Sequence, residues 1–426
     1  MASRDIIPDK LLLSHIFPDQ PQVSISIILQ NWGKCVFKAS FPDSLEPCCP
    51  KIVRLEVTSN EETAKQFAIV SAMQKIAADV VHDLVPRTLQ TGVVNNEQAK
   101  RLQFCVMEFV EGHTLEEAWE QMSGESRYSV VAALIEALQK LHSVRISDER
   151  VQALMQRVLK SSEREAFKKA VMGGPSTGFL EDGLALLTAR FKRVALKKPF
   201  CDMTPATGSD DVVIKSHYED IGSKRLQKSI MEQWEREAVL CHNDLTPRNI
   251  IVRPRSSPDG GSEYQLVAII DWELSGFYPA SYELSLQDTY LSGANRLASF
   301  YLLLKEGMRG LVPASPSQMS LLQAMEIMFE SRQKRLLEGS NIPAHIRQRF
   351  LQRLRLRRDE DPYVGWVPAV FTRAEAQALE DEVVAEMVAT RQAKAAQAHR
   401  PSHLLLSVAV AAAVVVVAAV CHCCCY

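Results

Sequence analysis

The decisive stretch of this sequence is Val239-Leu240-Cys241-His242-Asn243-Asp244-Leu245-Thr246-Pro247-Arg248-Asn249-Ile250-Ile251-Val252. Asp244 and Asn249 are five residues apart, and Pro247 between them interrupts any helix. Both side chains are therefore expected on a loop that can point a carboxylate and an amide into one site. The apolar run after Asn249 predicts a short buried strand that fixes this loop.

A second carboxylate follows at the end of the next predicted strand. Pro258 to Gly261 predicts a turn, and Leu266 to Ile270 predicts a return strand that delivers Asp271. Phosphoryl transfer needs an acid that orients a hydroxyl and metal ligands that neutralise phosphate charge. Mg²⁺ takes few protein oxygens together with phosphate oxygens, so an Asp in this place suits it. A lone Asp in a loop is usually a turn former or a helix cap, but the order loop, strand, turn, strand, Asp indicates phosphoryl transfer.

These residues resemble the catalytic and metal-binding loops of the aminoglycoside phosphotransferase and choline kinase-like family, which has the protein-kinase-like fold. The resemblance is nearest to a divergent version of the family that is abundant in filamentous fungi. It implies that Asp244 is the catalytic base and that Asn249 and Asp271 hold Mg²⁺. It also implies that His242 is a structural histidine and that Glu283 braces the catalytic loop.

The resemblance covers about residues 20 to 300 and includes the expected hinge at Val106–Gly112. There, Glu108 and Val110 are expected to hold the adenine of ATP through the backbone. The loop over the nucleotide would be a hairpin around Gly33. This hairpin is predicted between strands at Val23–Leu29 and Cys35–Phe41.

The N-lobe departs from the family pattern where a lysine should contact the nucleotide phosphates. Arg54 occupies the matching place in the strand predicted at Lys51–Val57, and Gln66 matches the partner glutamate on the next helix. Arginine keeps the positive charge, but its planar fork makes more directional hydrogen bonds than an ammonium group. Gln66 could hydrogen-bond Arg54. Lys51 would share the face of Arg54 only if the strand bulged.

The rest of the pattern predicts an α+β, two-lobed kinase-like fold. A small antiparallel β-rich N-lobe is expected over residues 1–110 and a larger helical C-lobe over 111–312, followed by a helical extension over 313–400. Within these parts, helices are predicted at Glu61–Ala78 and at Lys224–Glu237. Between them, a capping box at Thr114 and Glu117 indicates a helix start, and an amphipathic helix is predicted to end near His142. Residues 143–223 give no clear pattern.

Composition points to a soluble globular chain. Its 426 residues are 46% hydrophobic and carry a formal net charge of −2, which disfavours nucleic acid as a partner. Met1 to Asp19 has no long apolar run, so no signal peptide is expected. Scattered cysteines such as Cys35, Cys105 and Cys241 are expected to be buried thiols in a reducing, cytoplasmic compartment.

An uncharged run near the C-terminus could attach the chain to a membrane. Residues 404–420 are all uncharged, but this run is slightly shorter than the roughly 20 residues that span a bilayer. A C-terminal anchor and a poorly inserted extension are both left open by the sequence.

The sequence therefore predicts an ATP- and Mg²⁺-dependent phosphotransferase that transfers the γ-phosphate to a hydroxyl of a small molecule. Two other classes remain. A pseudokinase-like module that binds a nucleotide or a partner is favoured by Arg54 and Gln66, and disfavoured by the complete set of Asp244, Asn249 and Asp271. A membrane-tethered scaffold is the third. The sequence predicts neither the acceptor nor the oligomeric state.

Overall fold

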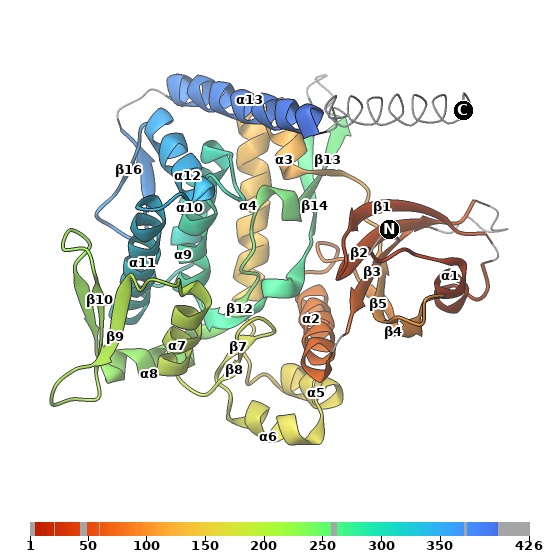
Figure 1. Ribbon diagram of the computed structural model, residues 1–426, viewed down its shortest axis with the longest axis horizontal. Helices are drawn as coiled ribbons and strands as arrows, with labels where there is room; N and C mark the ends of the chain where they lie inside the picture. The colour runs from red at the N-terminus through yellow and green to blue at the C-terminus, as the bar shows by residue number, and fades with distance from the viewer. Residues whose placement is uncertain are drawn as a thin grey trace, which may run out of the picture. The chain divides into compact units, whose positions relative to one another are not determined.

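The computed structural model describes residues 5–20, 22–42, 49–58, 60–256, 262–369 and 373–398 (Figure 1). Residues 1–369 form one compact unit, and residues 370–426 belong to a second. In the second unit the structure describes one long helix, α13 (Arg373–Ala398). The predicted turn at 258–261 and the uncharged run at 404–420 lie outside the described residues.

An antiparallel sheet of five strands, in the order β1-β2-β3-β5-β4, forms the N-lobe of the first unit. The strand predicted at Lys51–Val57 is β3 and has the same ends, and β5 ends at Glu108, within the predicted hinge. The N-lobe elements are α1 (Lys10–Ile16), β1 (Ser24–Gln30), β2 (Lys34–Ser40), β3 (Lys51–Val57), α2 (Glu61–Val80), β4 (Thr88–Asn95) and β5 (Arg101–Glu108).

The two faces of this sheet differ, and the difference decides where the charged residues of β3 point. Phe37, Val53, Leu55 and Phe104 are buried in a core that also contains residues of α1. Side chains alternate along a strand, so Arg54 faces the opposite side. Strand β3 pairs with both neighbours without a register shift. Lys51 therefore cannot share the face of Arg54.

The larger part of the first unit is mainly helical. The capping box at Thr114 is present and begins the short helix α3, and α4 ends at Leu141, as predicted. The structure thus confirms the α+β class with an antiparallel N-lobe sheet and a helix-rich C-lobe. The helices are α3 (Leu115–Ala118), α4 (Gly124–Leu141), α5 (Glu149–Val158), α6 (Ser161–Lys169), α7 (Gly183–Val194), α8 (Lys228–Glu237), α9 (Ala280–Tyr290), α10 (Ala298–Arg309), α11 (Pro316–Leu337) and α12 (Ile342–Arg353), with short 3₁₀ turns at η1 (Trp119–Gln121), η2 (Pro247–Asn249) and η3 (Trp272–Leu274).

Small sheets connect these helices, and one of them corrects a prediction. The helix predicted from Lys224 begins only at Lys228, because Ser223–Leu226 pairs with the preceding strand across a turn. This pairing satisfies the backbone N–H and C=O groups that would otherwise have formed the hydrogen bonds of a helix. The strands are β6 (His113–Thr114), β7 (Met172–Gly174), β8 (Gly178–Leu180), β9 (Cys201–Pro205), β10 (Val212–Ser216), β11 (Ser223–Leu226), β12 (Ala238–Cys241), β13 (Ile250–Ser256), β14 (Ser262–Ile269), β15 (Gly276–Pro279), β16 (Leu356–Arg358) and β17 (Trp366–Pro368).

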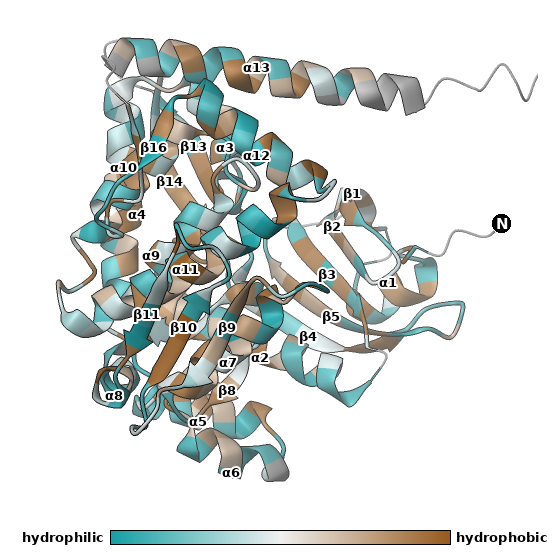
Figure 2. Cartoon of the chain, turned by 60° about the vertical axis from the view of Figure 1, so that its left-hand side comes forward, coloured by the Kyte–Doolittle hydropathy of each residue, from teal (hydrophilic) through white to brown (hydrophobic). Residues whose placement is uncertain are grey.

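Hydrophobic residues concentrate on the strands, as Figure 2 shows for the N-lobe sheet and for β10. The cysteines Cys35, Cys105, Cys201 and Cys241 are buried free thiols, as predicted. Every helix in the described part of the chain is too short or too polar to cross a membrane.

Candidate active site

The decisive stretch forms a buried loop between two strands. Strand β12 leads into the loop, η2 closes it, and β13 leaves it. His242, Asn243, Asp244 and Asn249 are all buried, and each is 5% exposed or less. The polar groups of such a loop need partners inside the protein.

Asp244 and Asn249 are held together by direct hydrogen bonds. The Asn249 side-chain nitrogen donates to the Asp244 carboxylate at 2.8 Å and to the Asp244 carbonyl at 2.9 Å. Because the nitrogen of the Asn249 amide makes both bonds, its oxygen is directed away from Asp244. Arg248 lies 3.5 Å from the same carboxylate and is half exposed. The structure therefore brings the Asp244 and Asn249 side chains together, and their roles stay predictions.

His242 connects this loop to the segment that carries Asp271. The backbone N–H of Asp244 donates to Nδ1 of His242 at 3.2 Å, so Nδ1 is unprotonated. The proton of the neutral ring is then on Nε2, which donates to the carbonyl of Ile270 at 3.0 Å. The imidazole also packs edge-on against Trp272, with ring centroids 4.6 Å apart. These contacts agree with a structural role for His242.

The loop is also braced from α9. The Glu283 carboxylate accepts a hydrogen bond from the backbone N–H of Asn243 at 2.7 Å, and His142 lies 3.2 Å from its other oxygen. The Tyr290 hydroxyl donates to the carbonyl of Asn243. Burial raises the pKa of Tyr290, and the nearby charge of Asp244 raises it further, so this hydroxyl stays a donor. Sequence reasoning anticipated Glu283 but missed Tyr290 and His142, which no local pattern marks.

Asp271 lies just after the return strand β14, before η3, in a left-handed backbone conformation with φ at 66°. The N–H of Ile270 donates to the carbonyl of Asn249 at 2.9 Å, so the β13–β14 hairpin brings Asp271 beside the catalytic loop. Burial raises the pKa of Asp271, and the negative charges of Glu273 and Asp244 add to this effect. A cluster of carboxylates with an amide oxygen is a donor set that fits a hard divalent cation such as Mg²⁺.

Glu273 forms ion pairs with two cations of the N-lobe sheet. The sequence did not predict these ion pairs. Its carboxylate lies 2.8 Å from Lys34 Nζ and 3.3 Å from an Arg54 guanidinium nitrogen. Arg54 Nε also donates to Glu56 at 2.7 Å. Burial acts to raise the pKa of Glu273, but the hydrogen bond from Lys34 and the two positive charges lower it overall. Lys34 and Arg54 thus share one acidic partner, and that partner is not on α2.

Gln66 does not take the place of the expected glutamate. Among the hydrogen bonds of the described residues, none joins it to Arg54, whose partners are Glu56 and Glu273. Arg54 and Gln66 instead border a common cavity of about 260 Å³, together with Gly33, Glu273 and Ser176. The expected Gln66 contact is therefore replaced by Glu273. Ser176 comes from a loop for which the sequence predicted no role.

The expected adenine-binding segment follows β5. The Glu108 side chain binds Arg87, and its backbone N–H donates to the Arg87 carbonyl at 3.1 Å. Val110 is partly exposed in the connection to the C-lobe. Lys38 from β2 lies 4.1 Å above the Phe109 ring. Glu108 and Val110 are thus located between the lobes, and their roles toward adenine stay predictions.

Comparison with known proteins identifies relatives. A model of the phosphotransferase enzyme family matches residues 50–301, whereas no curated protein matches the chain. Solved structures that resemble it include APH(2″)-IIa in its ternary complex with streptomycin and ATP, at 12% identity, covering 82% of this chain and 97% of that one, with a TM-score of 0.40. Another is macrolide 2′-phosphotransferase from Brachybacterium faecium, at 10% identity, covering 80% and 98%, with a TM-score of 0.40.

Likeness at these identities and TM-scores says nothing of the substrate of this chain. The family model carries the assignment, because its match extends over more than half of the 426 residues. The match also includes the strand with Arg54, the catalytic loop, Asp271 and Glu283. The chain belongs to the phosphotransferase enzyme family.

Proposed function

We propose that this protein transfers the γ-phosphoryl group of ATP to a hydroxyl group of a small molecule. The observation that carries the proposal is the joined geometry of the two loops. Asn249 bonds Asp244 through its side chain and Ile270, the residue before Asp271, through its backbone, and this connection supports a common site for Asp244, Asn249 and Asp271. Such a site supplies the acid and the metal ligands that phosphoryl transfer needs.

In the proposed reaction, Asp244 orients the acceptor hydroxyl and receives its proton. A bond forms between the acceptor oxygen and the γ-phosphorus while the bond from that phosphorus to the β–γ bridging oxygen breaks, and ADP leaves. Asn249 holds the Asp244 carboxylate in place by the 2.8 Å hydrogen bond. Glu283 and Tyr290 fix the backbone of the preceding residue, which limits the motion of Asp244.

Asn249 and Asp271 are the residues that would hold Mg²⁺, which neutralises phosphate charge when it is bound. Burial, and after it the charges of Glu273 and Asp244, raise the pKa of Asp271, and a bound cation would favour its charged form, which supports this role. The carboxylate and the amide oxygen are hard ligands of the kind that Mg²⁺ prefers.

Arg54 and Lys34 are the proposed contacts to the nucleotide phosphates. Both lie on the face of the sheet opposite the N-lobe core, and both pair with Glu273 next to Asp271. Glu273 would orient the two cations. Glu108 and Val110 would hold adenine through their backbone.

The rival reading is a nucleotide-binding pseudokinase. The observation in its favour is that Lys34 and Arg54 already pair with Glu273, and Arg54 also with Glu56, so phosphates must compete with carboxylates for both cations. The experiment is incubation of the purified protein with ATP, Mg²⁺ and a broad pool of metabolites, followed by mass spectrometry. A product heavier by one phosphoryl group supports the enzyme. ATP binding without any such product supports the pseudokinase.

A further inference from the structure

Arg248 is a cation beside the proposed base. One of its terminal nitrogens lies 3.5 Å from Oδ2 of Asp244, and its side chain is 54% exposed, so its other donors can be reached from outside. Among the ion pairs of the described residues, this is the one that either side chain forms. The separation is long for a hydrogen bond, so the guanidinium is free to contact a second anion.

The two oxygens of the Asp244 carboxylate have different surroundings. Asn249 donates to Oδ2 at 2.8 Å, and Arg248 approaches the same atom. In the described part of the chain, no hydrogen bond reaches Oδ1. Under the proposed function, on which this inference rests, Oδ1 is therefore the oxygen that receives the proton of the acceptor hydroxyl. Arg248 leaves that oxygen open.

The backbone places Arg248 and Asp271 at the same end of one hairpin. Ile250 of β13 pairs with Ile269 of β14. Arg248 precedes this pair by two residues, and Asp271 follows it by two. Arg248 is thus close to the proposed metal site as well as to the proposed base.

The positive charge of Arg248 also acts on Glu273. Burial acts to raise the pKa of Glu273, and the hydrogen bond from Lys34 and the charges of Lys34, Arg54 and Arg248 act to lower it. Glu273 is the partner of the two N-lobe cations that are proposed to contact the nucleotide phosphates. The field of Arg248 therefore extends from the proposed base to the proposed phosphate contacts.

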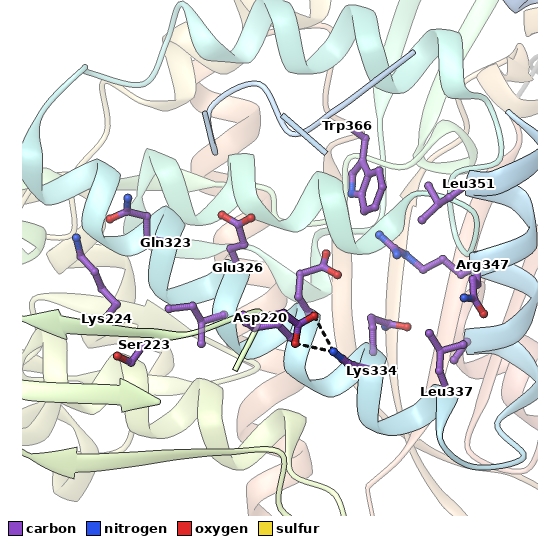
Figure 3. A pocket seen from close by; sticks show the side chains of 16 residues that line it. Asp220, Ser223, Lys224, Gln323, Glu326, Lys334, Leu337, Arg347, Leu351 and Trp366 are labelled. Carbon is purple, nitrogen blue, oxygen red and sulfur yellow. Dashed lines mark hydrogen bonds and ion pairs between the residues drawn. The ribbon is translucent and has the colours of Figure 1, made fainter. Parts of the chain in front are cut away.

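Arg248 differs from an arginine with a structural role. Arg347 lines a cavity of about 740 Å³ beside α11 and α12 (Figure 3). It is 8% exposed, and its charge is balanced by carboxylates of a buried cluster, among them Glu330 and Asp288. Such an arginine has no free charge to offer a ligand. Arg248 is half exposed and has one long contact, so its charge is available.

Phosphoryl transfer brings two negative groups together at the base. The acceptor oxygen lies between the base and the γ-phosphorus, so the Asp244 carboxylate and the γ-phosphoryl oxygens are close to each other in the proposed reaction. A cation between them offsets this repulsion, and the fork of an arginine can contact a carboxylate and a phosphate together. When Asp244 takes the acceptor proton, its charge is lost, and Arg248 then interacts with the phosphoryl group alone.

We propose that Arg248 is a catalytic residue that binds the γ-phosphoryl group of ATP through its free guanidinium nitrogens while one nitrogen stays beside Asp244 Oδ2. The acceptor proton passes to Asp244, the acceptor oxygen bonds to the γ-phosphorus, and ADP leaves with the electrons of the broken bond. Arg248 keeps its own protons throughout and stabilises the group that is transferred.

Calorimetric titrations of the full-length protein with ATP and with ADP, both with Mg²⁺, test this proposal, because ADP lacks the γ-phosphoryl group. Arg248→Ala should weaken ATP binding about tenfold or more and leave ADP binding within about twofold of the parent. Arg248→Lys keeps the charge and should lose less of the ATP affinity than Arg248→Ala.

The matched control is Arg255→Ala, which removes an exposed arginine from the far end of β13 and should alter neither affinity. An unchanged ATP affinity in Arg248→Ala, or equal losses of ATP and ADP affinity, would overturn this inference and leave the proposed function standing. A parent protein that binds neither nucleotide would overturn both.

Discussion

Lys34 on strand β2 and Glu273 in turn η3 form an ion pair of 2.8 Å across 239 positions of the chain. The pair joins the N-lobe sheet to the segment that immediately follows Asp271. Arg54 approaches the same carboxylate at 3.3 Å. Glu273 is thus the acidic partner of both Lys34 and Arg54.

The first prediction concerns these two cations. Arg54→Ala should weaken ATP binding by roughly 10- to 150-fold, because a charged hydrogen-bonding group typically contributes about 1.5–3 kcal/mol. Arg54→Lys should retain more binding, since the charge survives. Lys34→Ala should also weaken binding, and the double variant should lose less than the sum of the two free energies, because both cations share Glu273. Calorimetric titration with ATP and Mg²⁺ measures all four proteins.

The matched control for this series is Lys51→Ala, which removes a lysine on the opposite face of the same strand. ATP affinity should not change in it. If Lys51→Ala weakens binding while Arg54→Ala and Lys34→Ala do not, the assignment of the phosphate contacts is wrong.

The candidate catalytic and metal-binding residues could be predicted from the sequence, because they lie close together along the chain. Asp244, Asn249 and Asp271 lie on consecutive loop and strand segments, so spacing alone brings them together. The partners of the loop are different. Tyr290 reaches Asn243 from a helix 47 residues away, and no local pattern marks it. Lys34 and Glu273 are further apart still along the chain, and their contact is seen only in the folded structure.

The errors in the predicted elements have the same origin. The helix predicted at Lys224 lost its first turn because Ser223–Leu226 forms a strand with β10, and such pairing overrides local helix propensity. The Gln66–Arg54 hydrogen bond that the sequence allowed is not among the contacts of the described residues, where the carboxylate of Glu273, a stronger partner for a guanidinium, approaches Arg54.

The second prediction concerns Asp271. Burial and neighbouring carboxylates raise its pKa in the folded protein, so its ionisation opposes folding as pH rises through that pKa. Asp271→Asn should therefore stabilise the ligand-free protein at neutral pH, by roughly 0.5–2 kcal/mol, as is common when strained functional groups are removed. Urea unfolding with and without Mg²⁺–ATP measures this. The variant should also lose the metal dependence of ATP-induced stabilisation, and retention of that dependence would remove Asp271 from the metal site.

The third prediction is the opposite pH dependence for Glu273. Its folded pKa is lowered, so its contribution to stability is present above the ordinary carboxyl range and is lost as pH falls through the folded value. The stability difference between the parent and Glu273→Gln should shrink between about pH 5 and pH 3. Urea unfolding at a series of pH values gives this difference, with Glu56→Gln as the control that loses a partner of Arg54 only. A difference that stays constant with pH would contradict the ion-pair account.

The fourth prediction concerns residues 404–420. If this uncharged run is a C-terminal anchor, the full-length protein should sediment with membranes, and a chain ending at residue 400 should remain in the supernatant. Fractionation of cells that express each form measures this. Recovery of the full-length protein only in the soluble fraction ends the anchor hypothesis.

The most direct test of the central claim is the effect of Asp244→Asn on ATP binding and on phosphoryl transfer. Asp244 is proposed to act on the acceptor hydroxyl, so ATP affinity should stay within about twofold of the parent while the phosphorylated product found by mass spectrometry disappears. Asn retains the polar shape that bonds Asn249 and the loop, so the fold should be preserved. Product formation at the rate of the parent would contradict the account, because Asp244 would then not be the catalytic base.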